Sequence, residues 1–185
     1  LGPLYKHLLP ELPPTLLHLT LGLNYNHPLP DLPPTLLHLT LGNESKHPLQ
    51  VLPPTLTHLN LGSKYNYPLT DILPATLTHL TVGYFFNQSL DFLPQGLLYL
   101  KILDSCSQPL TNLPNTLQTL VVGEKYNETL DMLPDSIEVL NIKFYGNKIN
   151  KLPQNLKKVF ISKKYKYKND LRLLKPHLSI HINKS

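Results

Sequence analysis

Leucines recur along this chain with a spacing that is kept almost from end to end. Within residues 12–31 the pattern L-x-x-L-x-L is formed by Leu16, Leu19 and Leu21. Leu19 and Leu21 alternate with the polar Thr20. This alternation has the two-residue period of a strand with one buried face. The Leu-Pro step that opens the pattern recurs at positions 12, 32, 52, 73, 93, 113, 133 and 152. A near-constant period of this length is typical of a solenoid, in which each coil buries its apolar face against its neighbours.

The repeated strand predicts the architecture of each coil. Eight or nine strands, one per coil, would stack in register about 4.8 Å apart as a parallel sheet on the concave side. A coil of this length leaves no room for a second strand or a long helix, and its prolines favour extended backbone, so we expect an extended or polyproline-like convex side. The predicted buried row consists of Leu19, Leu39, Leu59, Leu80, Leu100, Leu120 and Leu140.

The repeat also bounds the domain organisation. We expect residues 1–185 to form a single repeat solenoid, with about eight repeats over residues 1–162 and a closing segment over residues 163–185. Residues 1–7 align with the segment that starts at Leu21, so the chain begins inside a repeat and we expect a truncated N-terminus. No apolar run is long enough to predict a membrane span. The single cysteine, Cys106, cannot form an internal disulfide, which favours an intracellular location.

Two further columns follow each strand. Glycine recurs at positions 22, 42, 62, 83 and 123, and we interpret it as a turn that needs a positive φ. An aromatic residue followed by asparagine comes next; the ring should fill the corner of the coil. The asparagine should be mostly buried and bonded to backbone groups of its own or an adjacent turn. This predicted structural ladder consists of Asn26, Asn66, Asn87 and Asn127.

The full pattern, L-P-x-x-L-x-x-L-x-L-G-x-x-[YF]-N-x-P-L, resembles the FNIP repeat, which is abundant in social amoebae and in giant viruses of amoebae. The best matches are YNHPL at 25–29, YNYPL at 65–69 and FNQSL at 86–90. The resemblance implies an α/β-class leucine-rich-repeat-like solenoid, β-rich with few or no helices. It also implies a protein-interaction array, often placed behind an F-box. The segment LPELPPTL at 9–16 is similar to the short leucine-rich repeats of secreted bacterial effectors, which lack the aromatic-Asn-x-Pro-Leu signature.

Histidine recurs at one outward position of the strands. Each of these histidines precedes an inward leucine, so the imidazoles should stack on the concave face at the strand spacing. Stacked imidazoles could bind a metal, but no convergent ligands accompany them, so we predict neither a metal nor a cofactor. A pH-sensitive surface fits better, because neighbouring imidazolium ions repel one another. The predicted binding residues are His18, His38, His58, His79 and Tyr99 in one row, and Thr20, Thr40, Asn60, Thr81 and Lys101 in a second.

Charge is concentrated at the C-terminal end. The net charge is +5, and residues 145–185 alone carry ten lysines and one arginine against a single acidic residue. Lysine and tyrosine interleave in SKKYKYKND at 162–170, a pattern that could bind nucleic acid or an anionic surface. The segment could equally be an ordinary last turn, because Tyr165 falls in the aromatic column. This alternative basic patch consists of Lys163, Lys164, Lys166 and Lys168.

The sequence shows no motif that indicates catalysis. It contains no Gly-rich phosphate loop, nucleophile elbow or CxxC, and Cys106 falls in the aromatic column, where it should be packed rather than reactive. We therefore predict a non-enzymatic protein–protein interaction scaffold. A more specific form is the substrate-recognition array of a larger F-box-type protein, in the host cytoplasm if the source is viral. The competing hypothesis is nucleic-acid or anionic-surface binding by the basic end, and we favour a protein partner over it.

Overall fold

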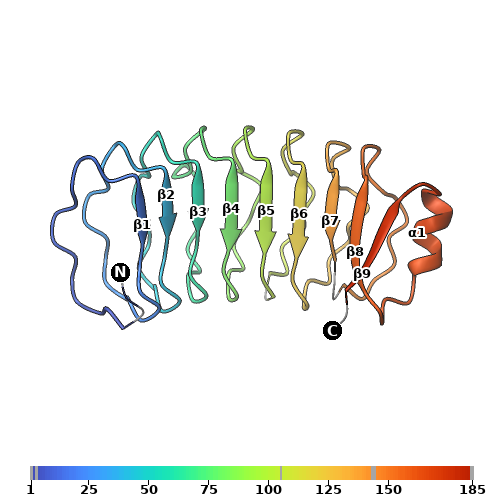
Figure 1. The fold of residues 1–185 in the computed structure, drawn as a ribbon, viewed down its shortest axis with the longest axis horizontal. Coiled ribbons are helices and arrows are strands. Elements are labelled where there is room, and N and C mark those ends of the chain that lie inside the picture. The colour runs from blue at the N-terminus through green and yellow to red at the C-terminus, as the bar shows by residue number, and fades with distance from the viewer. Residues whose placement is uncertain (1, 3, 105, 143–144, 184–185) are drawn as a thin grey trace.

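Nine short strands form one parallel sheet in the computed structural model, which describes residues 2, 4–104, 106–142 and 145–183. Each strand pairs with the next one in sequence, and Figure 1 shows them side by side along the long axis of the molecule. One strand per coil in a parallel sheet was the predicted architecture, and it is confirmed. The strands are β1 (His18–Thr20), β2 (His38–Thr40), β3 (His58–Asn60), β4 (His79–Val82), β5 (Tyr99–Ile102), β6 (Thr119–Val122), β7 (Val139–Asn141), β8 (Lys158–Ser162) and β9 (Ser179–Asn183).

Each coil repeats the one before it in register. Leu19 lies opposite Leu39, which lies opposite Leu59, and the same alignment continues through the later strands. The leucines of this row point inward and are buried, as predicted. Between the strands of the repeats the chain runs through turns, bends and backbone without regular secondary structure.

The aromatic residues after the strands close the corner of each coil. Tyr25, Tyr65 and Phe86 are fully buried, which confirms their predicted place in the core. The Tyr65 hydroxyl stays satisfied because the Leu49 N–H donates to it at 3.2 Å. Cys106 occupies the same column, and burial raises the pKa of its thiol. This cysteine is therefore packed, as the sequence pattern predicts.

The glycines that follow the strands serve a different purpose from the one expected. None of the described glycines has a positive φ, so the prediction of a left-handed turn was wrong. A Cβ on Gly62 would overlap the backbone carbonyl of Gly42, and a Cβ on Gly83 would overlap that of Gly62. Glycine is required here because successive coils bring their backbones into direct contact. Among the described residues the positive φ belongs to Asp71, at 61°, in the coil where the repeat is one residue longer.

The C-terminal coil departs from the repeat. A short helix, α1 (Lys168–Leu174), lies beyond β9 at the end of the array (Figure 1). Its Leu171 is fully buried and joins the core, whereas Ile182 on the terminal strand β9 is 40% exposed. One short helix fits the expectation of few or no helices. Within the described part of the chain, no helix is long and apolar enough to cross a bilayer.

Candidate functional site

Five aromatic side chains stack across the exposed face of the sheet. The strand register places His18, His38, His58, His79 and Tyr99 next to one another, and we call this row the His–Tyr ladder. Successive ring centroids are 4.4, 4.1, 4.2 and 5.5 Å apart. The His38–His58 and His58–His79 pairs are almost parallel, with interplanar angles of 7° and 9°. The ladder therefore follows directly from in-register pairing of the strands.

Two threonines fix the orientation of the His58 and His79 imidazoles. Thr57 Oγ1 lies 2.9 Å from His58 Nδ1, and Thr78 Oγ1 lies 2.9 Å from His79 Nδ1. Each hydroxyl also donates to a carbonyl of the preceding coil, that of Leu37 or Thr57, at 3.1 Å. A hydroxyl has one proton to donate, so each imidazole donates its Nδ1–H to the threonine. In the neutral ring Nε2 is then left as the acceptor.

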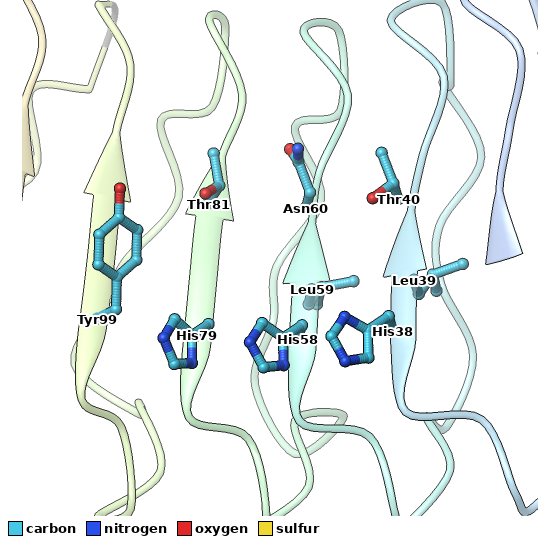
Figure 2. A pocket seen from close by; sticks show the side chains of 9 residues that line it. All are labelled: His38, Leu39, Thr40, His58, Leu59, Asn60, His79, Thr81 and Tyr99. Atoms are coloured by element: carbon cyan, nitrogen blue, oxygen red, sulfur yellow. The ribbon is translucent and has the colours of Figure 1, made fainter. Parts of the chain in front are cut away.

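A groove runs along the ladder and the row beside it. This second row, the polar row, consists of Thr20, Thr40, Asn60, Thr81 and Lys101. The groove has a volume of about 250 Å³ and is lined by His38, Leu39, Thr40, His58, Leu59, Asn60, His79, Thr81 and Tyr99. Figure 2 shows the ladder from His38 to Tyr99 and, beside it, Thr40, Asn60 and Thr81 of the polar row. His18, Thr20 and Lys101 belong to the same rows but lie outside the lining. That these side chains bind a partner stays a prediction.

The exposed sheet face carries no carboxylate in its strands. None of the nine described strands contains Asp or Glu; the acidic residues lie in the connecting segments, except Asp170 in α1. The lysines of the strands are Lys101 and Lys158. Glu138, directly before β7, is paired with Lys157 at 2.8 Å between Oε1 and Nζ. Over β1 to β5 the face thus offers imidazoles, hydroxyls, an amide and one positive charge.

Stacking makes the middle of the ladder hard to protonate. Burial lowers the pKa of His38, and repulsion from His18 and His79 lowers it further. The pKa of His58 is also lowered, first by burial and then by repulsion from the other ladder histidines. These directions follow because both causes disfavour the charged ring. The two central imidazoles are therefore neutral at pH 7.

The ladder geometry is poorly suited to a metal ion. Parallel stacked rings aim their lone pairs in parallel, whereas a tetrahedral ion needs ligands that converge on one point. Among the residues that the structure describes, no group of three or more His, Cys, Asp or Glu side chains is placed to hold a metal.

The asparagine ladder lies on the surface, so its expected burial was wrong. All four side chains are exposed: Asn26, Asn66, Asn87 and Asn127. The preceding ring fills the corner of the coil, and the next residue is therefore turned outward. Asn66 Oδ1 accepts the Asn87 N–H at 2.8 Å, and Asn26 and Asn87 make the same bond to the N–H groups of Lys46 and Ser107. At Asn127 it is the backbone carbonyl that accepts, from Asn147 Nδ2 at 2.8 Å.

The basic patch presents charged lysines, but the tyrosine rings between them are packed in the last coil. Its lysines lie in the turn after β8 and at the start of α1, and they are Lys163, Lys164, Lys166 and Lys168. The first three are exposed and Lys168 is half-buried. Tyr165 is buried and donates its hydroxyl to the Asn147 carbonyl at 3.0 Å, and Tyr167 packs against the core. These rings are occupied in the last coil, so they do not form a stacking platform for bases.

Sequence reasoning missed two sets of hydroxyl contacts. Thr55 Oγ1 lies 2.6 Å from the Pro34 carbonyl and 2.9 Å from the Leu36 carbonyl, and Thr35, Thr76 and Thr116 make equivalent contacts. The available signal was the threonine at positions 15, 35, 55, 76 and 116, which directly precedes the leucine at 16, 36, 56, 77 and 117. The second set joins the ladder histidines to the threonines before them. Its signal was the change from Leu-His in the first coils to Thr-His at positions 57–58 and 78–79.

Comparison with known proteins finds a repeat family and similar solved structures. A family model described as FNIP Repeat matches residues 25–64, 46–85 and 65–105. The chain is similar to the giant-virus protein CroV588, a circular leucine-rich-repeat structure, with 32% identity and a TM-score of 0.80. That match covers 94% of this chain and 28% of CroV588. It is also similar to YopM from Yersinia enterocolitica WA-314, with 21% identity and a TM-score of 0.50, over 83% of this chain and 43% of that one.

The YopM likeness shows the fold alone. No curated protein sequence matches the chain. The repeat columns, the in-register parallel sheet and the matches over residues 25–105 agree with one another. The chain carries FNIP repeats over residues 25–105 and has a leucine-rich-repeat-like solenoid fold.

Proposed function

We propose that this chain is a non-enzymatic protein-recognition module and that it binds its partner with the exposed sheet face around the His–Tyr ladder. The observation that carries the proposal is the groove, which is lined by aromatic rings, hydroxyls and an amide on a rigid row of strands. Solenoids of this kind are built to present such extended surfaces. Aromatic side chains also supply much of the binding energy at protein interfaces.

The way residues vary along the array supports the same conclusion. The buried leucine row is almost constant, whereas the outward ladder position changes from histidine in β1 to β4 to Tyr99, Thr119, Val139 and Lys158 in the later strands. A constant frame with a varied face can fit one partner and reject others. The family resemblance adds a more specific form, in which this array selects substrates within a larger F-box-type chain. Its single buried cysteine suits an intracellular setting, the host cytoplasm if the source is viral.

Three variants of the full chain test the proposal. His38→Ala/His58→Ala/His79→Ala removes the centre of the ladder, and a second variant replaces the four lysines of the basic patch with alanine. The control, His27→Ala/His47→Ala, removes two histidines that lie off the sheet face, where their rings contact backbone carbonyls of the preceding turn at 2.8 and 3.1 Å. Partners captured from amoebal lysate would be identified, purified and titrated against each variant. Hydrogen exchange of the complex would locate the protected strands.

We expect the ladder variant to weaken binding at least tenfold, which corresponds to about 1.4 kcal/mol. Protection should fall on β2 to β5, and the control should bind like the unmodified chain. The opposite pattern would reject the proposal in favour of the basic end. In that pattern the lysine variant alone loses its partners, nuclease treatment removes them, and binding falls steeply with salt.

A further inference from the structure

The charges that face the ladder all have one sign. β1 to β4 contribute only the four imidazoles, and β5 contributes Tyr99 and Lys101. The residues directly before these strands are Leu17, Leu37, Thr57, Thr78 and Leu98, none of which is charged. The acidic side chains nearest in the repeat are those of the connecting segments, such as Glu44, which is paired with Lys64 at 2.6 Å. No described strand residue therefore supplies a carboxylate to neutralise a protonated ladder.

We infer that the partner segment held by the His–Tyr ladder is acidic, a carboxylate-rich stretch of protein, and that its binding draws protons onto the ladder. The inference rests on the proposed function and names the chemistry of its partner. Charge complementarity supports it, because ladder and polar row offer hydrogen-bond donors and positive charge, with no carboxylate on those strands. An acidic segment laid along the groove would meet one imidazole about every 4 Å.

The threonine contacts determine where the proton goes. At His58 and His79 the Nδ1–H is already committed to a hydroxyl, so a proton taken from solvent must be added at Nε2. The new Nε2–H can donate to a carboxylate oxygen, which gives a charge-assisted hydrogen bond. The bound carboxylate also offsets the burial and the repulsion that lower the pKa values of His38 and His58. Anion binding and protonation therefore favour each other, by thermodynamic linkage.

The linkage fixes the direction in which affinity changes with pH. In the free chain His38 and His58 are neutral at pH 7, and binding of an anion raises their pKa. Affinity for an acidic segment therefore rises as the pH falls, by up to about tenfold per pH unit for each proton taken up. Lysine stays charged through this range, so binding to the basic patch would show no such dependence.

The probe is a fluorescent poly-glutamate peptide of about a dozen residues, with poly-glutamine of equal length as the neutral probe. Both are titrated at about pH 7.5 and about pH 5.5, where glutamate stays ionised, at fixed ionic strength. The parent chain carries Lys163→Gln, Lys164→Gln, Lys166→Gln and Lys168→Gln, which removes the basic patch. The ladder variant adds His38→Gln, His58→Gln and His79→Gln, and the matched control adds His27→Gln and His47→Gln instead.

We expect poly-glutamate to bind the parent and the matched control about tenfold more tightly at the lower pH. The ladder variant should lose that dependence, and poly-glutamine should bind weakly at both values. NMR titration of His58 with and without poly-glutamate gives a readout that needs no variant, and its pKa should rise when the peptide is bound. An unchanged His58 pKa, or equal binding of the two peptides, would overturn the inference.

Two other outcomes also count against it. In the first, oligothymidylate binds the parent but not the ladder variant, and poly-glutamate binds neither. That result would assign the groove to phosphates. A captured partner that needs the ladder but binds with the same affinity at both pH values would leave the proposed function standing and reject the acidic, proton-coupled partner.

Discussion

At the scale of single residues, the close approach of successive coils decides what each position tolerates. The glycines after the strands have ordinary φ values, yet a single added carbon would meet the backbone of the next coil. The exposed asparagines use the same proximity differently, since each of three reaches one coil onward to a backbone N–H. Neither effect is local, and both depend on where the neighbouring coil lies.

Gly62→Ala should therefore destabilise the chain. The new Cβ would overlap the backbone of Gly42, which cannot move without opening the stack. Overpacking of this kind costs about 1–3 kcal/mol in the free energy of unfolding. Gly146→Ala is the matched control, because its added Cβ would meet no heavy atom within 4 Å beyond its own chain neighbours. Urea denaturation of both variants measures the difference, and equal midpoints would mean that the coils do not press on one another at this column.

Asn66→Ala should cost less than the loss of a buried hydrogen bond. The side chain is exposed, so the Asn87 N–H that it leaves can bond to water, and we expect a loss of about 0.5–1.5 kcal/mol. Both side-chain bonds at this site are accepted by Oδ1, from Asn87 N and Gln88 Nε2. Asn66→Asp keeps that acceptor and should retain most of the stability. If Asn66→Asp lost as much stability as Asn66→Ala, the Oδ1 acceptor would not be the group that stabilises this turn.

The glycine expectation failed because the cause of that column lies between coils, and the asparagine expectation failed because the residue after an inward ring is turned outward. The sequence pattern indicated that glycine and asparagine occupy fixed columns, and that result holds. It could not say whether each column is explained within a coil or between coils, because distances between coils are absent from a linear pattern. The buried leucines and tyrosines were predictable because burial alone explains them.

At the scale of elements, the strands were predictable and the helix was not. Leu19, Leu39 and their equivalents recur with the same neighbours in every coil, so each strand is supported by all the others. Helix α1 occurs once and spans seven residues, too few for a helical period to stand out. Its side-chain N-cap hydrogen bond is lacking, and Leu171 packs into the end of the array. Tertiary packing rather than local sequence therefore holds this helix.

Leu171→Ala should weaken the C-terminal end of the array selectively. Truncation of a fully buried leucine costs about 2–5 kcal/mol. In a solenoid each coil contacts only its neighbours, so the loss should lower hydrogen-exchange protection in α1 and β9 before it affects β2 to β5. Leu173→Ala is the control, because that side chain is 80% exposed and its truncation should change stability by less than about 0.5 kcal/mol. A uniform loss of protection along the sheet would show that the array unfolds as one unit.

At the scale of the whole molecule, the array has two chemically different ends on one uniform frame. The ladder and its acid-free face lie on β1 to β5, whereas the excess positive charge follows β7. The frame was predictable because repetition multiplies a weak signal. The candidate site was predictable as a row of outward residues, but not as a hydrogen-bonded stack, because the contacts of Thr57 and Thr78 depend on the register of the coils.

Stability should fall when the pH is lowered from about 7.5 to about 5.5. The folded-state pKa values of His38 and His58 are lowered, so the unfolded chain binds more protons below its own histidine pKa of about 6.5. The free energy of unfolding is therefore unaffected above that pH and decreases as the pH falls from it toward the lowered values. Asp131 acts in the same direction at lower pH: hydrogen bonds from Asn150 and Lys151 outweigh its partial burial and lower its pKa, so its contribution is lost only below about pH 4.

Urea denaturation of the unmodified chain and of His38→Gln/His58→Gln at several pH values separates the two effects. The unmodified chain should lose stability across the histidine window, while the variant should show a shallower dependence there and the same decline at lower pH. His27→Gln/His47→Gln serves as the control for histidines outside the ladder. If the double ladder variant kept the full slope, burial and repulsion within the ladder would not be what opposes protonation. The proton coupling inferred for the binding face would then lack its physical cause.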